Sequence, residues 1–109
     1  MRHLITICTV FIALAYAAHA AAGGDPVAGK KKAEEVCQAC HGVDGNSPSD
    51  QFPKIAGQHE DYMIATLQKY KTGKRANPIM QGMVAVLSEQ DVKNVSAWYS
   101  KQKGLFLKY

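Results

Sequence analysis

Cys37-Gln38-Ala39-Cys40-His41 is the stretch of sequence that decides the fold of this chain. Two thiols three positions apart can each form a thioether with adjacent vinyl groups of one porphyrin, and the imidazole that follows can bind the iron. In an exported protein, a C-x-x-C-H run is the attachment signature of a c-type haem. The run therefore predicts one covalently attached haem c, held by Cys37 and Cys40, with His41 as an axial iron ligand.

The rest of the sequence favours none of the other uses of a cysteine pair. A thioredoxin-like dithiol belongs to a β-α-β pattern, and no such pattern surrounds these residues. A structural zinc site needs four ligands, and the sequence has no second C-x-x-C or H-x-H pair to complete one. A disulfide between Cys37 and Cys40 would close a very short loop and would remove little entropy from the unfolded chain.

The N-terminus carries the pattern of an export signal. A basic start is followed by an apolar stretch over residues 4–18, and residues 18–20 have the A-x-A form of a cleavage site. This pattern is typical of a secretory signal peptide. A transmembrane anchor is the weaker alternative, because the run is shorter than the roughly 20 apolar residues that cross a bilayer. We expect a signal peptide over 1–20, one domain over 21–109, a periplasmic location and no stable membrane anchor.

Length and charge limit the classes of function that the chain can have. It has 109 residues and a formal net charge of +4 at pH 7, which allows one domain. A domain this small struggles to stabilise itself by side-chain packing alone and often needs a disulfide, a metal or a cofactor. The basic residues are scattered and accompany no recognised nucleic-acid motif. We therefore expect no nucleic-acid partner.

Hydrophobic spacing and helix caps predict an all-α domain with long loops. Asp25 is placed as an N-cap, Ser88 with Asp91 forms a capping-box pattern, and Gly73 is a helix stop. These signals predict three helices, over about 26–40, 60–71 and 88–102, with loops over 42–52 and 72–87. Loops this long in so small a domain are uncommon unless they are functional. We expect them to wrap around the haem.

The second axial ligand decides what a haem protein does. Iron held by His and Met suits electron transfer, whereas an open position suits gas binding or peroxide chemistry. His59 precedes a predicted helix and is expected at the surface, and Met63 has the spacing of a core residue. Met80 and Met83 lie in the second loop, where either could reach the haem. Spacing alone does not choose between them.

The chain resembles class I c-type cytochromes, and is particularly similar to the single-haem domain of the two-haem periplasmic cytochromes of the c-four type. The matching segments follow one another in the same order through most of residues 21–109. They are Cys37-Gln38-Ala39-Cys40-His41-Gly42, Asp44-Gly45-Asn46-Ser47, Phe52-Pro53-Lys54-Ile55-Ala56-Gly57-Gln58, Ile79-Met80-Gln81-Gly82 and Leu87-Ser88-Glu89-Gln90-Asp91. Only one such domain is present, so no internal two-haem relay is expected.

The resemblance implies roles for individual residues. In this family the axial methionine lies eight residues before the cap of the last helix, which corresponds to Met80 counted back from Ser88. Met83 is then the fallback ligand. The family also places a proline twelve residues after the ligand histidine, and its carbonyl accepts the imidazole Nδ1–H. Pro53 takes that place for His41, where such an acceptor fixes the tautomer of the ligand.

Further residues are expected at the helix crossing and around the haem. Gly29 and Tyr99 match the place where the first and last helices of the family cross. Four apolar residues are expected to form the haem wall: Ile55, Ile79, Leu87 and Trp98. Four basic residues are candidates for the rim of an exposed haem edge, where they would steer an acidic partner: Lys54, Lys71, Lys74 and Arg75.

The function expected from these features is single-electron transfer between redox proteins by Fe(III)/Fe(II) cycling with His41 and Met80 as ligands. The protein would then be an electron carrier rather than an enzyme. Its partners would be redox proteins, and the sequence does not identify the donor or the acceptor. One alternative is a haem subunit of a larger dehydrogenase or oxidase, which the apolar tail 104–109 leaves open. A less favoured alternative is a five-coordinate haem sensor or peroxidase.

Overall fold

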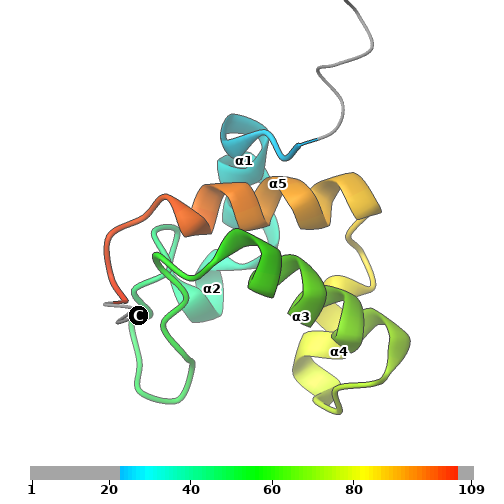
Figure 1. Ribbon diagram of the computed structural model, residues 1–109. Coiled ribbons are helices and arrows are strands. Elements are labelled where there is room, and N and C mark those ends of the chain that lie inside the picture. The colour runs from blue at the N-terminus through cyan, green and yellow to red at the C-terminus, as the bar shows by residue number, and fades with distance from the viewer. Residues whose placement is uncertain (1–22, 106–109) are drawn as a thin grey trace, which may run out of the picture.

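The computed structural model describes residues 23–105, and within that range it contains helices and no strand (Figure 1). The helices are α1 (Pro26–Val36), α2 (Gln38–His41), α3 (Glu60–Thr72), α4 (Pro78–Val84) and α5 (Glu89–Ser100). None of these helices is both long and apolar enough to cross a membrane. The expected signal peptide over 1–20 and the tail beyond residue 105 lie outside the described residues.

Helices α1 and α5 cross at close range and form the main helix–helix contact of the domain (Figure 1). A Cβ atom at Gly29 would lie 1.9 Å from the backbone oxygen of Asn94, so a side chain at position 29 would collide with α5. Beside the crossing, Tyr99 is buried in a cluster with Ala33 and Met63. The expected packing roles of Gly29 and Tyr99 at this crossing are confirmed.

We expect Gly29→Ala to lower the free energy of unfolding by about 1–3 kcal/mol, because overpacking displaces the two helices. Alanine is the better helix former by about 1 kcal/mol, so a loss of stability can only come from the collision. Urea unfolding of the haem-loaded protein measures the change. Lys31→Ala, at an exposed position of the same helix, is the control and should have little effect. A Gly29→Ala variant as stable as the parent would contradict the close crossing.

The three helix-terminus signals of the sequence have the predicted roles. The Asp25 carboxylate accepts a hydrogen bond from the Val27 backbone N–H at the start of α1. Ser88 and Asp91 form a complete capping box at the start of α5. Gly73 ends α3 in the left-handed conformation, with a φ of 77°. The three predicted helices therefore correspond to α1 with α2, to α3 and to α5.

The predicted helix over 26–40 is interrupted at Cys37. Helix α1 ends at Val36, and α2 starts at Gln38. Cys37 keeps right-handed helical dihedral angles, with φ −103° and ψ −29°, so the chain bends without leaving helical space. Helix α2 then ends at Gly42, where a φ of 79° turns the chain away. Cys37 thus lies at the bend between the two helices, and Cys40 lies within α2.

The predicted loop over 72–87 is wrong between Pro78 and Val84, where the chain forms α4. The Asn77 side chain caps this helix by accepting a hydrogen bond from the Met80 backbone N–H at 3.0 Å, and Pro78 occupies its first turn. Both are helix-start signals. Gly82 lies within this helix although glycine is a poor helix former. Met80 consequently lies on a short helix rather than on an extended strap.

Candidate haem site

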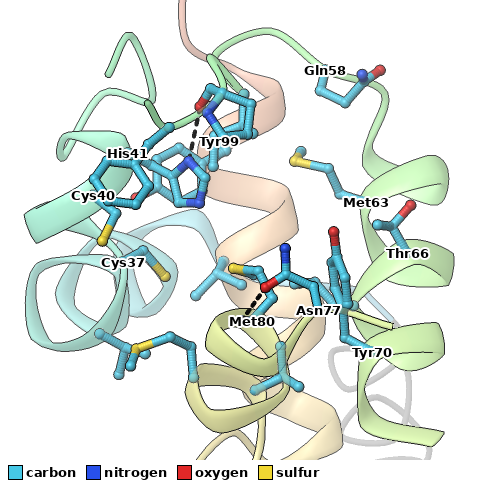
Figure 2. Close-up of a pocket in the computed structure, with 18 of the residues that line it drawn as sticks. Cys37, Cys40, His41, Gln58, Met63, Thr66, Tyr70, Asn77, Met80 and Tyr99 are labelled. Carbon is cyan, nitrogen blue, oxygen red and sulfur yellow. Dashed lines mark hydrogen bonds between the residues drawn. The ribbon is translucent and has the colours of Figure 1, made fainter. Parts of the chain in front are cut away.

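A cavity of about 370 Å³ opens between α2, α3, α4 and the loop that precedes α3. Its size falls within the range of about 300–1,000 Å³ that is usual for cofactor sites. Figure 2 shows Cys40 and His41 on one side of this cavity and Thr66 and Tyr70 on the other. The Met80 side chain enters between these two sides. The cavity thus gathers residues from segments that are far apart in the sequence.

The two cysteines line the cavity as free thiols. Burial raises the pKa of the Cys37 thiol to about 11, against a smaller lowering by its hydrogen bond with the Tyr99 side chain. The thiol is therefore protonated at neutral pH. Catalytic dithiols have a lowered thiol pKa, and the shift at Cys37 has the opposite direction.

His41 is held in one orientation by the main chain. The imidazole is 8 % exposed, and its Nδ1 atom lies 2.8 Å from the backbone oxygen of Pro53 (Figure 2). A backbone carbonyl can only accept, so the proton of the neutral ring is on Nδ1. The lone pair of Nε2 is then available to a metal ion. A hydrogen bond of this kind also makes the imidazole a better donor to the metal.

The loop that carries Pro53 is braced against α2. The Ser47 backbone N–H donates to the His41 carbonyl at 2.8 Å, and the Ser47 hydroxyl donates to the Phe52 carbonyl at 2.7 Å. Ser47 is the only described residue other than glycine with a positive φ, at 55°. His41 and Phe52, the residue before Pro53, are thereby both tied to Ser47, one through its backbone N–H and the other through its hydroxyl. This arrangement fixes the acceptor relative to the ring.

Met80 and Met83 both line the cavity from α4, and they differ in exposure. Met80 is partly buried and packs against the cluster formed by Val84, Leu87 and Val92. Met83 is 42 % exposed. Met80 is therefore the more firmly positioned thioether of the two.

The residues expected at the haem wall fall into two groups. The three that line the cavity are Ile55, Ile79 and Leu87. Trp98 is not part of the lining: its indole N–H donates to the Val43 carbonyl at 2.6 Å, and the Lys30 ammonium lies 5.6 Å from the ring centre. Trp98 lies on the side of α5 that faces α1, whereas its neighbour Tyr99 faces the cavity, because successive helical residues point about 100° apart.

Two aromatic residues of the lining were not assigned to it from the sequence. Tyr99 lines the cavity, and its hydroxyl donates to the Gly42 carbonyl at 2.9 Å. Tyr70 lines it from α3, with the Arg75 guanidinium 5.1 Å from its ring centre. Val92, Val95 and Tyr99 follow one another at helical spacing, and this spacing is the sequence signal that Tyr99 faces the interior. Nothing in the spacing of Tyr70 separates a cavity residue from an ordinary core residue.

The donor set fits a haem better than a bare metal ion. Within residues 23–105, no cluster of three or more His, Cys, Asp or Glu side chains could hold a metal. The cavity offers one imidazole with a free Nε2, two thiols, thioethers and a mainly apolar wall. In a haem, the porphyrin supplies four nitrogen ligands to the iron. One imidazole and one soft donor from the protein would complete the coordination.

A comparison with protein families agrees with this fit. The family model described as cytochrome c matches residues 26–102, which include every described helix. The chain belongs to the cytochrome c family. Haem c is accordingly its covalent cofactor, and Cys37, Cys40 and His41 supply the attachment run. The all-helical architecture is the class I cytochrome c fold.

Individual relatives place the chain more closely within the cytochrome c family. It is 44 % identical to cytochrome c4 of Pseudomonas aeruginosa over 94 % of its own length and 50 % of that protein. It is 35 % identical to a thiosulfate dehydrogenase electron acceptor of Thiomonas intermedia, over 94 % of its length and 45 % of that protein. The crystal structure of reduced cytochrome c4 from Pseudomonas stutzeri superposes with a TM-score of 0.70 at 46 % identity, covering 76 % of this chain and 48 % of that one. The chain thus spans about half the length of these relatives.

Proposed function

We propose that this cytochrome is a periplasmic carrier of single electrons, with one haem c bound between His41 and Met80. The observation that carries the proposal is the convergence of both side chains on one cavity: an imidazole with its Nε2 free, and a partly buried thioether. Haem ligated by His and Met has a raised potential and suits electron transfer. The expected signal peptide supports the location.

The residues of the chain would keep the iron environment constant while its charge changes. When bound, the haem supplies one-electron chemistry between Fe(III) and Fe(II). Pro53 fixes the His41 ring through its backbone oxygen, and Asn77 fixes the start of the helix that carries Met80. The apolar lining excludes water from both ligands. Little has to reorganise on oxidation, which favours rapid transfer.

The surface beside the cavity supports contact with another redox protein. Ile79 is 59 % exposed and Met83 is 42 % exposed, and both line the cavity as well. Lys54 and Arg75 also line it and add positive charge at this edge. An apolar patch with a basic border fits a transient partner that has an acidic rim. The donor and the acceptor are the partners to be sought.

Permanent association with a larger redox complex is the second candidate. One relative is named as the electron acceptor of thiosulfate dehydrogenase, and Val86, which follows α4, is a further apolar side chain that is 67 % exposed. Sizing the natively expressed protein separates the two. A free carrier elutes at the mass of the haem-loaded monomer. Co-elution with a dehydrogenase or oxidase that survives high salt would replace the first candidate by the second.

Spectroscopy of the haem-loaded protein tests the proposed ligation. We expect the oxidised protein to show the sulfur-to-iron charge-transfer band in the far red. We expect the reduced protein to bind no carbon monoxide at neutral pH, because both axial positions are filled. Ready carbon monoxide binding without the far-red band would instead indicate a five-coordinate haem, and with it a sensor or a peroxidase.

A further inference from the structure

The side chain of Lys71 joins the end of α3 to the junction between α4 and α5. Its ammonium donates a hydrogen bond to the Leu87 backbone carbonyl. Although Lys71 lies at the surface, its side chain is only 23 % exposed, and its Nζ lies 3.8 Å from a carboxylate oxygen of Glu89. Gln68, one turn earlier, donates to the other Glu89 oxygen at 3.3 Å. The ammonium is thus engaged within the molecule and is not a free steering charge.

Leu87 is the far end of the segment that carries Met80. We call residues 75–87 the Met80 segment. At its near end, α3 holds the chain through the Arg75 backbone N–H, which donates to the Lys69 carbonyl at 3.1 Å. At its far end, α3 holds the chain through the Lys71 side chain. Both ends of the Met80 segment are therefore attached to the same helix.

The far end has little freedom as long as the Lys71 bond is intact. Leu87 is 4 % exposed, and its backbone N–H donates to the Val84 carbonyl at 3.0 Å. Its own carbonyl faces the ammonium. A hydrogen bond from a charged donor is stronger than one between neutral groups. Moving the Met80 segment outward from its far end requires this bond to break.

We infer that Lys71 is a positioning residue that keeps the Met80 thioether in place by latching the far end of the Met80 segment to α3. The inference rests on the proposed ligation of the haem iron by Met80. An added ligand reaches the iron only when Met80 has moved away, so the latch adds to the free energy of that opening. Without the latch, the closed state is less favoured and opening is more frequent.

Imidazole binding to the oxidised, haem-loaded protein measures this opening. Lys71→Met keeps the apolar stem and removes the ammonium. We expect its apparent imidazole affinity to rise about tenfold, equivalent to about 1.4 kcal/mol. The limiting rate of imidazole binding at high concentration should rise as well, because that rate reports how often Met80 leaves. Disappearance of the far-red charge-transfer band follows the reaction.

A matched control separates the latch from the loss of a positive charge. Lys69→Met removes the same charge from an exposed position of the same helix and should leave imidazole affinity unchanged. Equal affinities in Lys71→Met and the parent would overturn the inference, and so would an equal rise in Lys71→Met and Lys69→Met.

A second pair of variants keeps the test decisive if Lys71→Met fails to fold. Lys71→Arg retains a charged donor and should bind imidazole like the parent, whereas Lys71→Gln should bind it more tightly. Identical affinities in these two would overturn the latch. The far-red band of the parent is recorded first, since its absence would refute Met80 ligation itself. A parent with the band and no change in any Lys71 variant would refute the latch alone.

Discussion

Replacing Cys37 and Cys40 together by alanine should yield a chain that carries no covalent haem and does not fold. The cavity that the haem would fill measures about 370 Å³. Without the haem, water would enter this opening, and the mainly apolar lining would lose its packing partner. The whole stability of a protein domain is about 5–15 kcal/mol. A domain this small has little stability to spare, so we expect the loss to unfold it.

Circular dichroism and haem staining on a denaturing gel measure the outcome. The double variant should lose most of its helical signal at room temperature and should show no haem that survives denaturation. Each single variant keeps one possible thioether and serves as the matched control. We expect the singles to retain haem with reduced thermal stability. A double variant with the helical content of the parent would show that the protein has a core independent of its cofactor.

Met80→Ala should abolish the far-red charge-transfer band of the oxidised protein. It should also lower the midpoint potential by a substantial part of the about 0.8 V range over which axial ligands tune haem. The physical reason is that a thioether stabilises Fe(II) relative to Fe(III), and water or a nitrogen ligand in its place does so less. The reduced variant should bind carbon monoxide at neutral pH. Potentiometric titration with optical detection measures the band and the potential, and the absorption spectrum of the reduced variant under carbon monoxide measures the binding.

Met83→Ala is the matched control for Met80. It removes the same side chain from the same helix, at a position that is 42 % exposed rather than packed against the core. We expect the band and the potential to remain close to those of the parent. Loss of the band in Met83→Ala with retention in Met80→Ala would reverse the ligand assignment and leave the rest of the fold unaffected.

Local signals in the sequence were enough to predict the main helices. Asp25, Ser88 and Gly73 each act within a few residues, so their roles can be read without knowing what lies opposite them. Helix α4 was missed because residues 72–87 were assigned to a loop that contains Pro and Gly, although Asn77 and Pro78 are helix-start signals. In a short helix, one hydrogen-bonded cap and one tertiary contact face can override an unfavourable residue.

The cavity was predictable only in part, because its lining depends on which face of each helix meets the haem. Periodicity identifies the apolar face of α5 but does not tell whether Trp98 or its neighbour Tyr99 points inward. The hydrogen bond that engages the Lys71 side chain within the molecule could not be predicted either. Its partner is the Leu87 carbonyl, sixteen residues away in the sequence, and no property of either residue marks them as a pair.

The crossing of α1 and α5 also constrains when the molecule can become folded. The Asp25 backbone N–H, just before α1, donates to the Asn94 side chain at 2.8 Å, across 69 residues of sequence. The contacts that complete this fold join its first helix to its last. A chain that is still being synthesised therefore lacks this crossing until α5 has emerged. We expect Cys37 and Cys40 to be accessible to haem attachment during that interval, because α5 has not yet packed against α1.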